Sequence, residues 1–267
     1  MVCLFVAAAA LALAAACTEE TPQPINPDRV PDSVVDTVAG SAPAPAERCN
    51  KSGNTPAAKV VVTTEDQVHL AGVRFGSGTR GVVLLPQRGA DLCPWWDYAH
   101  ELSMAGFHVL AIDSRGTGYS EEGTVVDYTA DAKAAVAELK RAGAERVVLM
   151  GASIGGATAL VTAGRIPDEV AGVVALSYPD DSLDVTGGGG SGPKTPTEAA
   201  PLITAPVLIA YTTGDPQAAK PDDLIAKLNG PEKQLVGRSG VSHGWDMLKL
   251  GDDDVRPDVL AFLQSYA

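Results

Sequence analysis

Short runs of consecutive apolar residues recur along the chain and predict a buried sheet. Six of these runs are rich in β-branched side chains and end at polar or glycine-containing turns: residues 60–63, 81–85, 109–112, 147–150, 172–176 and 207–210. Continuous rather than alternating hydrophobicity indicates strands that are covered on both faces. Two more strands are expected, at residues 68–75, which would form an antiparallel hairpin with the first run, and at residues 233–236.

Helical periodicity lies between these runs. It is clearest where Ala132, Ala135, Val136 and Leu139 recur on one face of a helix that Gly143 is placed to end. Further helices are expected over residues 95–105, 155–165, 220–229 and 255–265. The alternation of strand and helix with short connections predicts an α/β domain over residues 59–267, with a mostly parallel, doubly wound sheet flanked by helices.

One low-complexity stretch, the glycine-rich residues 187–193, interrupts this alternation and is expected to be a loop. Enzymes of this architecture can insert a helical lid at such a point. The segment from residue 177 to residue 203 is short and polar, so little or no lid domain is expected.

The first sixteen residues read as a signal peptide, because they are uncharged, mostly Ala, Leu and Val, and too few to span a bilayer. Residues 13–17, Leu-Ala-Ala-Ala-Cys, resemble the lipobox of bacterial lipoproteins, which implies cleavage before Cys17 and lipidation of that cysteine. The alternative is secretion after cleavage at an Ala-x-Ala site, which leaves Cys17 as a thiol. Both interpretations place the protein outside the cytoplasm, either secreted or lipid-anchored to the outer face of a membrane in a bacterial cell envelope.

Residues 17–58 are expected to form a tether, because seven prolines and no sustained apolar period follow Cys17. Cys49 and Cys93 are the two thiols that remain once Cys17 is lipidated. In an oxidising compartment we expect them to form a disulfide that joins the end of the tether to the domain, the alternative being two unpaired cysteines.

Charge and motif content exclude several classes of function. The chain has 33 acidic and 20 basic residues and a net charge of -13, so it would repel nucleic acid and anionic membrane surfaces. Neither a phosphate-binding G-x-x-x-x-G-K motif nor a zinc-binding H-E-x-x-H motif is present. No cofactor or metal is therefore expected, and membrane contact is expected through a lipid anchor alone.

The strongest chemical signal is G-x-S-x-G at residues 151–155, directly after the predicted strand at 147–150 and before a helical stretch. A nucleophilic serine has to be raised on a strained strand-to-helix turn, and small neighbours are needed because other backbone comes close. Ser153 meets both requirements. The alternative is an ordinary glycine-rich turn with a helix-capping serine.

A base and an orienting carboxylate follow in the order that such a serine requires. Asp215 comes after the strand at 207–210, and His243 lies in a loop between the last predicted strand and the last helix. Carboxyl ends of parallel strands meet at one edge of a sheet, so both can reach Ser153. The alternatives are a turn aspartate and a loop histidine. His69, His100 and His108 fall in a hairpin, a helix and a strand.

With Ser, Asp and His in this order, residues 59–267 resemble the α/β-hydrolase family. The resemblance implies an oxyanion hole made by the backbone N–H of Ile154 and by that of Arg88 or Gln87, in a segment similar to the family's turn after an early strand. It also implies that Asp113 and Arg115, in a D-x-R-G-x-G-x-S segment, fix a loop. The expected catalytic residues are Ser153, Asp215 and His243.

The expected activity is ester hydrolysis. His243 would take the proton of Ser153, which would attack the carbonyl of a small ester or other acyl substrate, and water would then hydrolyse the acyl-enzyme. A thioesterase, peptidase or acyltransferase would use the same three residues. The alternative from another class is a non-catalytic binding or scaffold lipoprotein that has kept the hydrolase fold.

Overall fold

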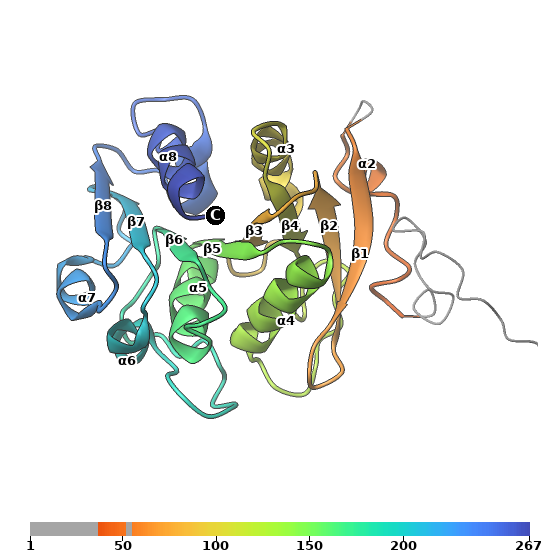
Figure 1. Ribbon diagram of the computed structural model, residues 1–267, viewed down its shortest axis with the longest axis horizontal. Helices are drawn as coiled ribbons and strands as arrows, with labels where there is room; N and C mark the ends of the chain where they lie inside the picture. Colours follow the sequence, from red (N-terminus) through yellow and green to blue (C-terminus); the bar gives the residue numbers. More distant parts are fainter. Residues whose placement is uncertain (1–36, 52–54) are drawn as a thin grey trace, which may run out of the picture.

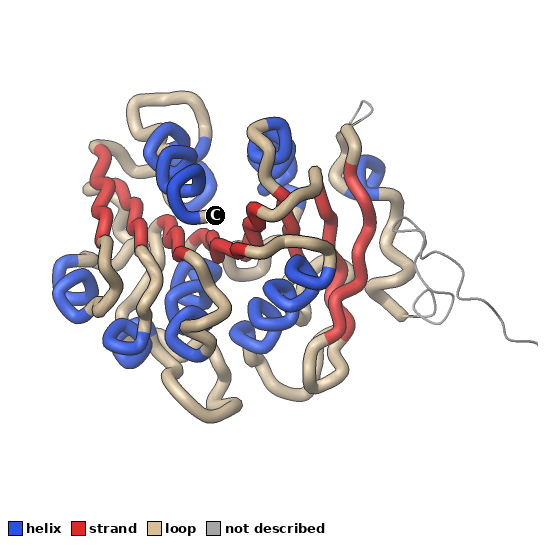
Figure 2. The backbone as a smooth tube through the Cα atoms, viewed as in Figure 1, coloured by secondary structure: helices blue, strands red, loops and turns tan. Residues whose placement is uncertain are grey.

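An eight-stranded sheet runs through the middle of the protein (Figures 1 and 2). The computed structural model describes residues 37–51 and 55–267. The strands are β1 (Ala57–Thr63), β2 (His69–Phe75), β3 (Arg80–Leu85), β4 (His108–Ile112), β5 (Arg146–Ala152), β6 (Gly172–Leu176), β7 (Val207–Thr212) and β8 (Lys233–Arg238).

The sheet is mostly parallel and doubly wound, as predicted. Its order is β1-β2-β4-β3-β5-β6-β7-β8. β2 pairs antiparallel with both β1 and β4, and every other neighbouring pair is parallel. The carboxyl ends of β3 to β8 therefore share one edge, and the loops that leave these ends can meet there.

Helices cover both faces of the sheet. Their bounds are α2 (Pro45–Arg48), α3 (Trp96–Met104), α4 (Tyr128–Arg141), α5 (Ile154–Arg165), α6 (Pro196–Ala199), α7 (Asp222–Lys227) and α8 (Arg256–Tyr266), with 3-10 helices η1 (Cys93–Trp95), η2 (Ala200–Leu202) and η3 (Gly244–Leu248). Helices α3 and α8 lie on one face, and α4 to α7 lie on the other (Figure 1). No helix within the described ranges combines the length and apolar composition needed to cross a membrane.

Each inner strand contributes to two separate cores, which explains the continuous apolar runs. In β5, Val147 and Leu149 pack with α4 and α5, whereas Val148 and Met150 pack with α3 and α8. Side chains alternate between the two faces of a strand, so a strand covered on both sides needs apolar residues at every position.

Helix α4 shows how local sequence sets an element's bounds. The carboxylate of Asp127 accepts hydrogen bonds from Thr129 N at 3.0 Å and from Ala130 N at 3.2 Å, which caps the first turn. The chain leaves the helix through Gly143, whose φ of 109° is in a region that favours glycine.

The segment from residue 177 to residue 203 does not form a lid. Its helix α6, which the sequence did not predict, packs against α5 on one face of the sheet. Ala199 is fully buried there, and a Cβ at Gly164 would come within 2.9 Å of the Ala199 Cβ atom. The small residues at this contact let the two helices approach closely.

Residues 37–51, which we name the N-terminal strap, pack against the domain. Cys49 and Cys93 form a disulfide, and the Lys59 Nζ atom donates to the carbonyl oxygens of Gly40 and Ala42. The buried Arg48 forms an ion pair with the buried Asp113. The prediction of a poorly packed tether over residues 17–58 is therefore wrong for the strap and for the start of β1 at Ala57. Cys17 lies outside the described residues.

Candidate active site

Ser153 occupies the turn between β5 and α5. Its φ of 53° and ψ of -121° lie in a region that residues with a side chain rarely adopt. Ser153 N donates a 2.8 Å hydrogen bond to the carbonyl oxygen of Leu176 at the end of β6. A Cβ at Gly151 would lie 2.1 Å from the backbone of Gly155, and one at Gly155 would lie 2.4 Å from Leu85 O. The two glycines therefore allow the strained turn on which a nucleophilic serine depends.

Asp215 and His243 lie in the loops that follow β7 and β8, and the fold brings their side chains together. Asp215 Oδ2 and His243 Nδ1 are 2.6 Å apart, and the carboxylate side chain is 1% exposed. Asp215 Oδ1 accepts a 2.9 Å hydrogen bond from Gln217 N. Because an ionised carboxylate accepts hydrogen bonds, Nδ1 is the donor in this contact, and in a neutral imidazole that tautomer leaves Nε2 as an acceptor, as a general base requires.

Two further hydrogen bonds join these two loops, one between backbone groups and one from a threonine side chain to the backbone. Gly214 N donates to Gly240 O at 2.9 Å, and the Thr212 hydroxyl donates to Ser242 O at 2.9 Å. Both bonds lie within three residues of Asp215 or His243. The relative position of carboxylate and imidazole is thus set by backbone as well as by their own contact.

Ser153 and His243 line one pocket of about 560 Å³. The other residues around it are mostly polar: Gln87, Arg88, Ile154, Pro179, Asp180, Leu183, Gln217 and Asp246. Among the hydrogen bonds of the described residues, none joins Ser153 Oγ to His243 Nε2. The two groups therefore share the pocket without a hydrogen bond in this conformation, a contact that can tighten when a substrate binds.

Three residues of this pocket have backbone N–H groups for which no acceptor is found among the described residues. Ile154 is the first residue of α5, so its N–H has no partner within the helix. Gln87 and Arg88 form the turn after β3, and in the described part of the chain neither backbone N–H reaches an acceptor. A Cβ at Gly155 would also lie 2.6 Å from Pro86 O, so this turn lies against the start of α5. All three residues expected at an oxyanion hole line the pocket.

A family model described as the alpha/beta hydrolase fold matches residues 82–224, more than half of the chain. The protein belongs to the α/β-hydrolase family. The matched segment contains Ser153 and Asp215 and ends before His243. A comparison with curated protein sequences found no significant match.

Solved structures of α/β-hydrolases have the same fold. The esterase Pf2001 from Pyrococcus furiosus superposes with a TM-score of 0.68 at 20% identity, over 84% of this chain and 94% of the esterase. Alpha/beta hydrolase domain-containing protein 10 from mouse gives a TM-score of 0.61 at 16% identity, over 78% of this chain and 98% of the mouse chain. A predicted CIB-like hydrolase from Thermoplasma acidophilum gives 0.58 at 17% identity, over 79% of this chain and 96% of its own.

In this α/β-hydrolase, Asp113 and Arg115 hold loops and do not line the pocket. Asp113 is fully buried and accepts hydrogen bonds from Leu92 N at 2.9 Å and Tyr119 N at 2.8 Å. Burial raises the pKa of Asp113 and Arg48 opposes that effect. Arg115 donates to the buried carboxylate of Asp131 at 2.8 Å.

The other histidines of the hydrolase lie away from the pocket. His69 Nδ1 is 2.9 Å from the carboxylate of Glu121, and His108 Nδ1 is 3.3 Å from Gly78 O. His100 belongs to α3. Three consecutive aspartates, residues 252–254, precede α8, and Asp254 forms an ion pair with Arg256 at 2.7 Å. Residues 37–51 and 55–267 hold no group of three or more side chains suited to a metal ion.

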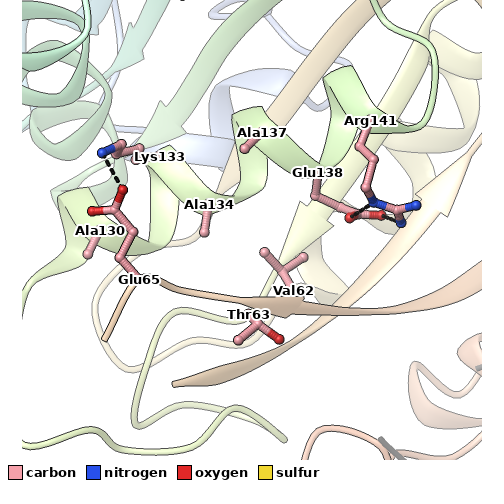
Figure 3. Close-up of a pocket in the computed structure, with 9 residues that line it drawn as sticks. All are labelled: Val62, Thr63, Glu65, Ala130, Lys133, Ala134, Ala137, Glu138 and Arg141. Atoms are coloured by element: carbon pink, nitrogen blue, oxygen red, sulfur yellow. Dashed lines mark hydrogen bonds and ion pairs between the residues drawn. The ribbon is translucent and has the colours of Figure 1, made fainter. Parts of the chain in front are cut away.

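A second cavity of about 240 Å³ lies between the end of β1 and α4 (Figure 3). Val62, Ala134 and Ala137 give it apolar walls. Its charged side chains form ion pairs with one another, Lys133 with Glu65 and Arg141 with Glu138 (Figure 3). It contains no cysteine, serine or histidine, so the pocket beside Ser153 is the candidate active site.

The sequence did not indicate the role of the Gln87 side chain. Gln87 Oε1 accepts a 3.2 Å hydrogen bond from Trp245 N, two residues after His243. The two residues are 158 positions apart, and no local pattern connects them. Only the folded arrangement of the β3 turn beside the histidine loop brings them together.

Proposed function

We propose that this α/β-hydrolase is an exported serine hydrolase that cleaves ester bonds of small substrates through an acyl-enzyme. The observation that carries the proposal is the buried Asp215–His243 pair, which shares a pocket with Ser153 on its strained turn. The similarity in fold to an esterase from Pyrococcus furiosus supports the same reaction class.

In the proposed reaction, His243 Nε2 takes the proton of Ser153 Oγ as that oxygen attacks the ester carbonyl. The carbonyl oxygen becomes an oxyanion, which the N–H of Ile154 and that of Arg88 or Gln87 stabilise. The tetrahedral intermediate collapses as the imidazolium protonates the leaving alcohol. Water then attacks the acyl-enzyme with His243 again acting as base, and Ser153 is released with a carboxylic acid.

Labelling with a fluorophosphonate tests the proposal, because an activated serine reacts with it quickly. The mature protein should be labelled, and Ser153→Ala and His243→Ala should abolish labelling. Ser191→Ala, in the exposed glycine-rich loop, and His100→Ala, in α3, are matched controls that should keep it. Folded wild-type protein that remains unlabelled would reject the catalytic function and favour a binding protein of hydrolase fold.

The pocket lining supports short, polar esters as substrates. Ile154, Pro179 and Leu183 are its apolar residues, so a long acyl chain would find little apolar surface to bury. We predict that kcat/KM for p-nitrophenyl acetate and butyrate exceeds that for the decanoate by about tenfold or more. Equal or better hydrolysis of the decanoate would contradict a short-chain preference while leaving the serine mechanism intact.

We also propose that Cys17 carries a lipid after removal of residues 1–16. Its basis is the lipobox-like sequence alone. In a bacterial host, the wild-type protein should partition with membranes, whereas Cys17→Ala should appear in the soluble fraction. Mass spectrometry of the N-terminal peptide would identify the lipid, and an unmodified Cys17 would favour simple secretion.

A further inference from the structure

Gln87 connects two parts of the site that are 158 residues apart in the sequence. Its backbone belongs to the turn after β3, where Ala90 N donates to Gln87 O at 3.2 Å. Its side chain reaches the start of η3, directly after the loop that follows β8, where Oε1 accepts the N–H of Trp245 at 3.2 Å. One residue therefore connects the turn that supplies an oxyanion donor with the loop that supplies the base.

Gly244, the residue after His243, lies close to the Gln87 side chain on one side and to the end of β5 on the other. Gly244, between His243 and Trp245, has a φ of 60°, and a Cβ on it would lie 1.9 Å from Gln87 Oε1. The same Cβ would lie 3.1 Å from the Cβ of Ala152, the residue before the nucleophile. Gly244 thus packs between the Gln87 side chain and the end of β5.

The hydrogen bond also fixes the orientation of the Gln87 amide. Because Oε1 faces the Trp245 N–H, Nε2 is the opposite end of the amide. Among the described residues Nε2 has no protein acceptor, and Gln87 lines the pocket beside Ser153 and His243. The side chain is thus held at its oxygen end while it borders the substrate pocket.

We propose that the Gln87 side chain is a positioning residue that fixes the position of His243 relative to Ser153 and to the turn after β3. This inference rests on the proposed serine-hydrolase function. Catalysis depends on sub-ångström placement of the base, whereas folding depends little on one neutral hydrogen bond. Loss of the bond should therefore affect turnover much more than stability or substrate binding.

Three variants test the inference. Gln87→Leu keeps the approximate size and removes the acceptor, and Gln87→Asn keeps an amide that is one methylene too short to reach Trp245. Gln264→Leu, on the exposed side of α8, is the matched control. We expect both Gln87 variants to lower kcat about tenfold or more with KM within about threefold, and the control to change neither.

A double-mutant cycle separates positioning from a general structural effect. If Gln87 acts through His243, Gln87→Leu should reduce the residual ester hydrolysis of His243→Ala by less than about twofold. Melting temperatures of Gln87→Leu and Gln87→Asn should remain close to that of wild type. If the Leu variant does not fold, the Asn variant provides the same comparison.

Amide hydrogen exchange tests the geometry without relying on activity. The Trp245 N–H should exchange about tenfold faster in both Gln87 variants than in wild type, because its acceptor is lost. Inactive wild-type protein would reject the proposed function. Active wild type with unchanged kcat in both Gln87 variants, unchanged Trp245 exchange, or an undiminished Gln87→Leu effect in His243→Ala would reject the positioning role alone.

Discussion

The conformation of Ser153 depends on the absence of side chains at two neighbouring positions. We predict that Gly151→Ala destabilises the fold by about 3 kcal/mol, because the new Cβ would lie 2.1 Å from the backbone of Gly155 and neither backbone can move independently. Urea denaturation would measure the loss. Gly251→Ala, at an exposed position where a Cβ would lie 3.4 Å from its nearest neighbour, should cost little.

The ion pair between Arg115 and Asp66 makes the free energy of unfolding depend on pH in the acid range. The hydrogen bond from Arg115 lowers the pKa of Asp66 to about 2, below its usual value of 3.8. A carboxyl group whose pKa is lower in the folded state stabilises the fold above the unfolded pKa, and this stabilisation is lost as the pH falls towards 2.

We therefore predict that Asp66→Asn lowers the free energy of unfolding at pH 7 by about 1 kcal/mol, a value reduced for solvent screening because the side chain is 42% exposed. The difference from wild type should shrink by pH 3. Urea denaturation at both values checks it, with the exposed Asp223→Asn as control. A difference that grows at acid pH would contradict the assigned direction of the pKa shift.

How well each part of the site can be predicted depends on how far apart in the sequence the interacting residues lie. Ser153 can be predicted as a candidate nucleophile because the features it needs, a strand end and two glycines, lie within a few consecutive residues. Asp215 and His243 can be predicted as its partners because strand order places their loops at one edge, and the structure puts these two side chains in contact. The hydrogen bond from Trp245 to Gln87 could not be found, since neither residue type nor spacing distinguishes it.

Among the elements, the inner strands were predicted well and the N-terminal strap was not. Burial on both faces gives β3 to β7 a continuous apolar signal that few other structures produce. The strap is held by the Cys49–Cys93 disulfide, which was predicted from the cysteines, and by the Arg48–Asp113 ion pair, which leaves no trace in a hydrophobic pattern. Helix α6, at four residues, is too short to show a period.

The disulfide should stabilise the domain by restricting the unfolded chain. Cys49 and Cys93 are 44 residues apart, a loop for which chain-entropy arguments give about 4 kcal/mol. We predict that the double variant Cys49→Ala/Cys93→Ala loses about 2–4 kcal/mol in urea denaturation under oxidising conditions. Wild type in reducing agent should approach the double variant. A loss below about 1 kcal/mol would indicate that the strap is held by its other contacts.

At the scale of the whole molecule, charge should influence which esters reach the pocket. The net charge is -13, and Asp180 and Asp246 add carboxylates at the site, although Arg88 and Lys249 oppose them. A negative field concentrates cations near the surface, and salt screens this effect over about 10 Å at 0.1 M.

A matched pair of substrates tests this field. We predict that kcat/KM for a choline ester falls about threefold as NaCl rises from about 10 mM to about 200 mM, whereas that for the neutral 3,3-dimethylbutyl ester of the same acid stays nearly constant. Equal salt dependence for the two esters would show that the molecular charge does not act on substrate capture.

The N-terminal strap lies at one edge of the sheet (Figure 1). β1 is an outermost strand of the sheet, and the strap passes along its open side (Figure 1). Unpaired strand edges invite pairing with another chain, and a covering loop is a known protection. At the opposite side, β8 has the charged residues Lys233 and Arg238 at its ends. We therefore predict that the strap hinders edge-to-edge aggregation, and that a chain shortened to begin at β1 self-associates.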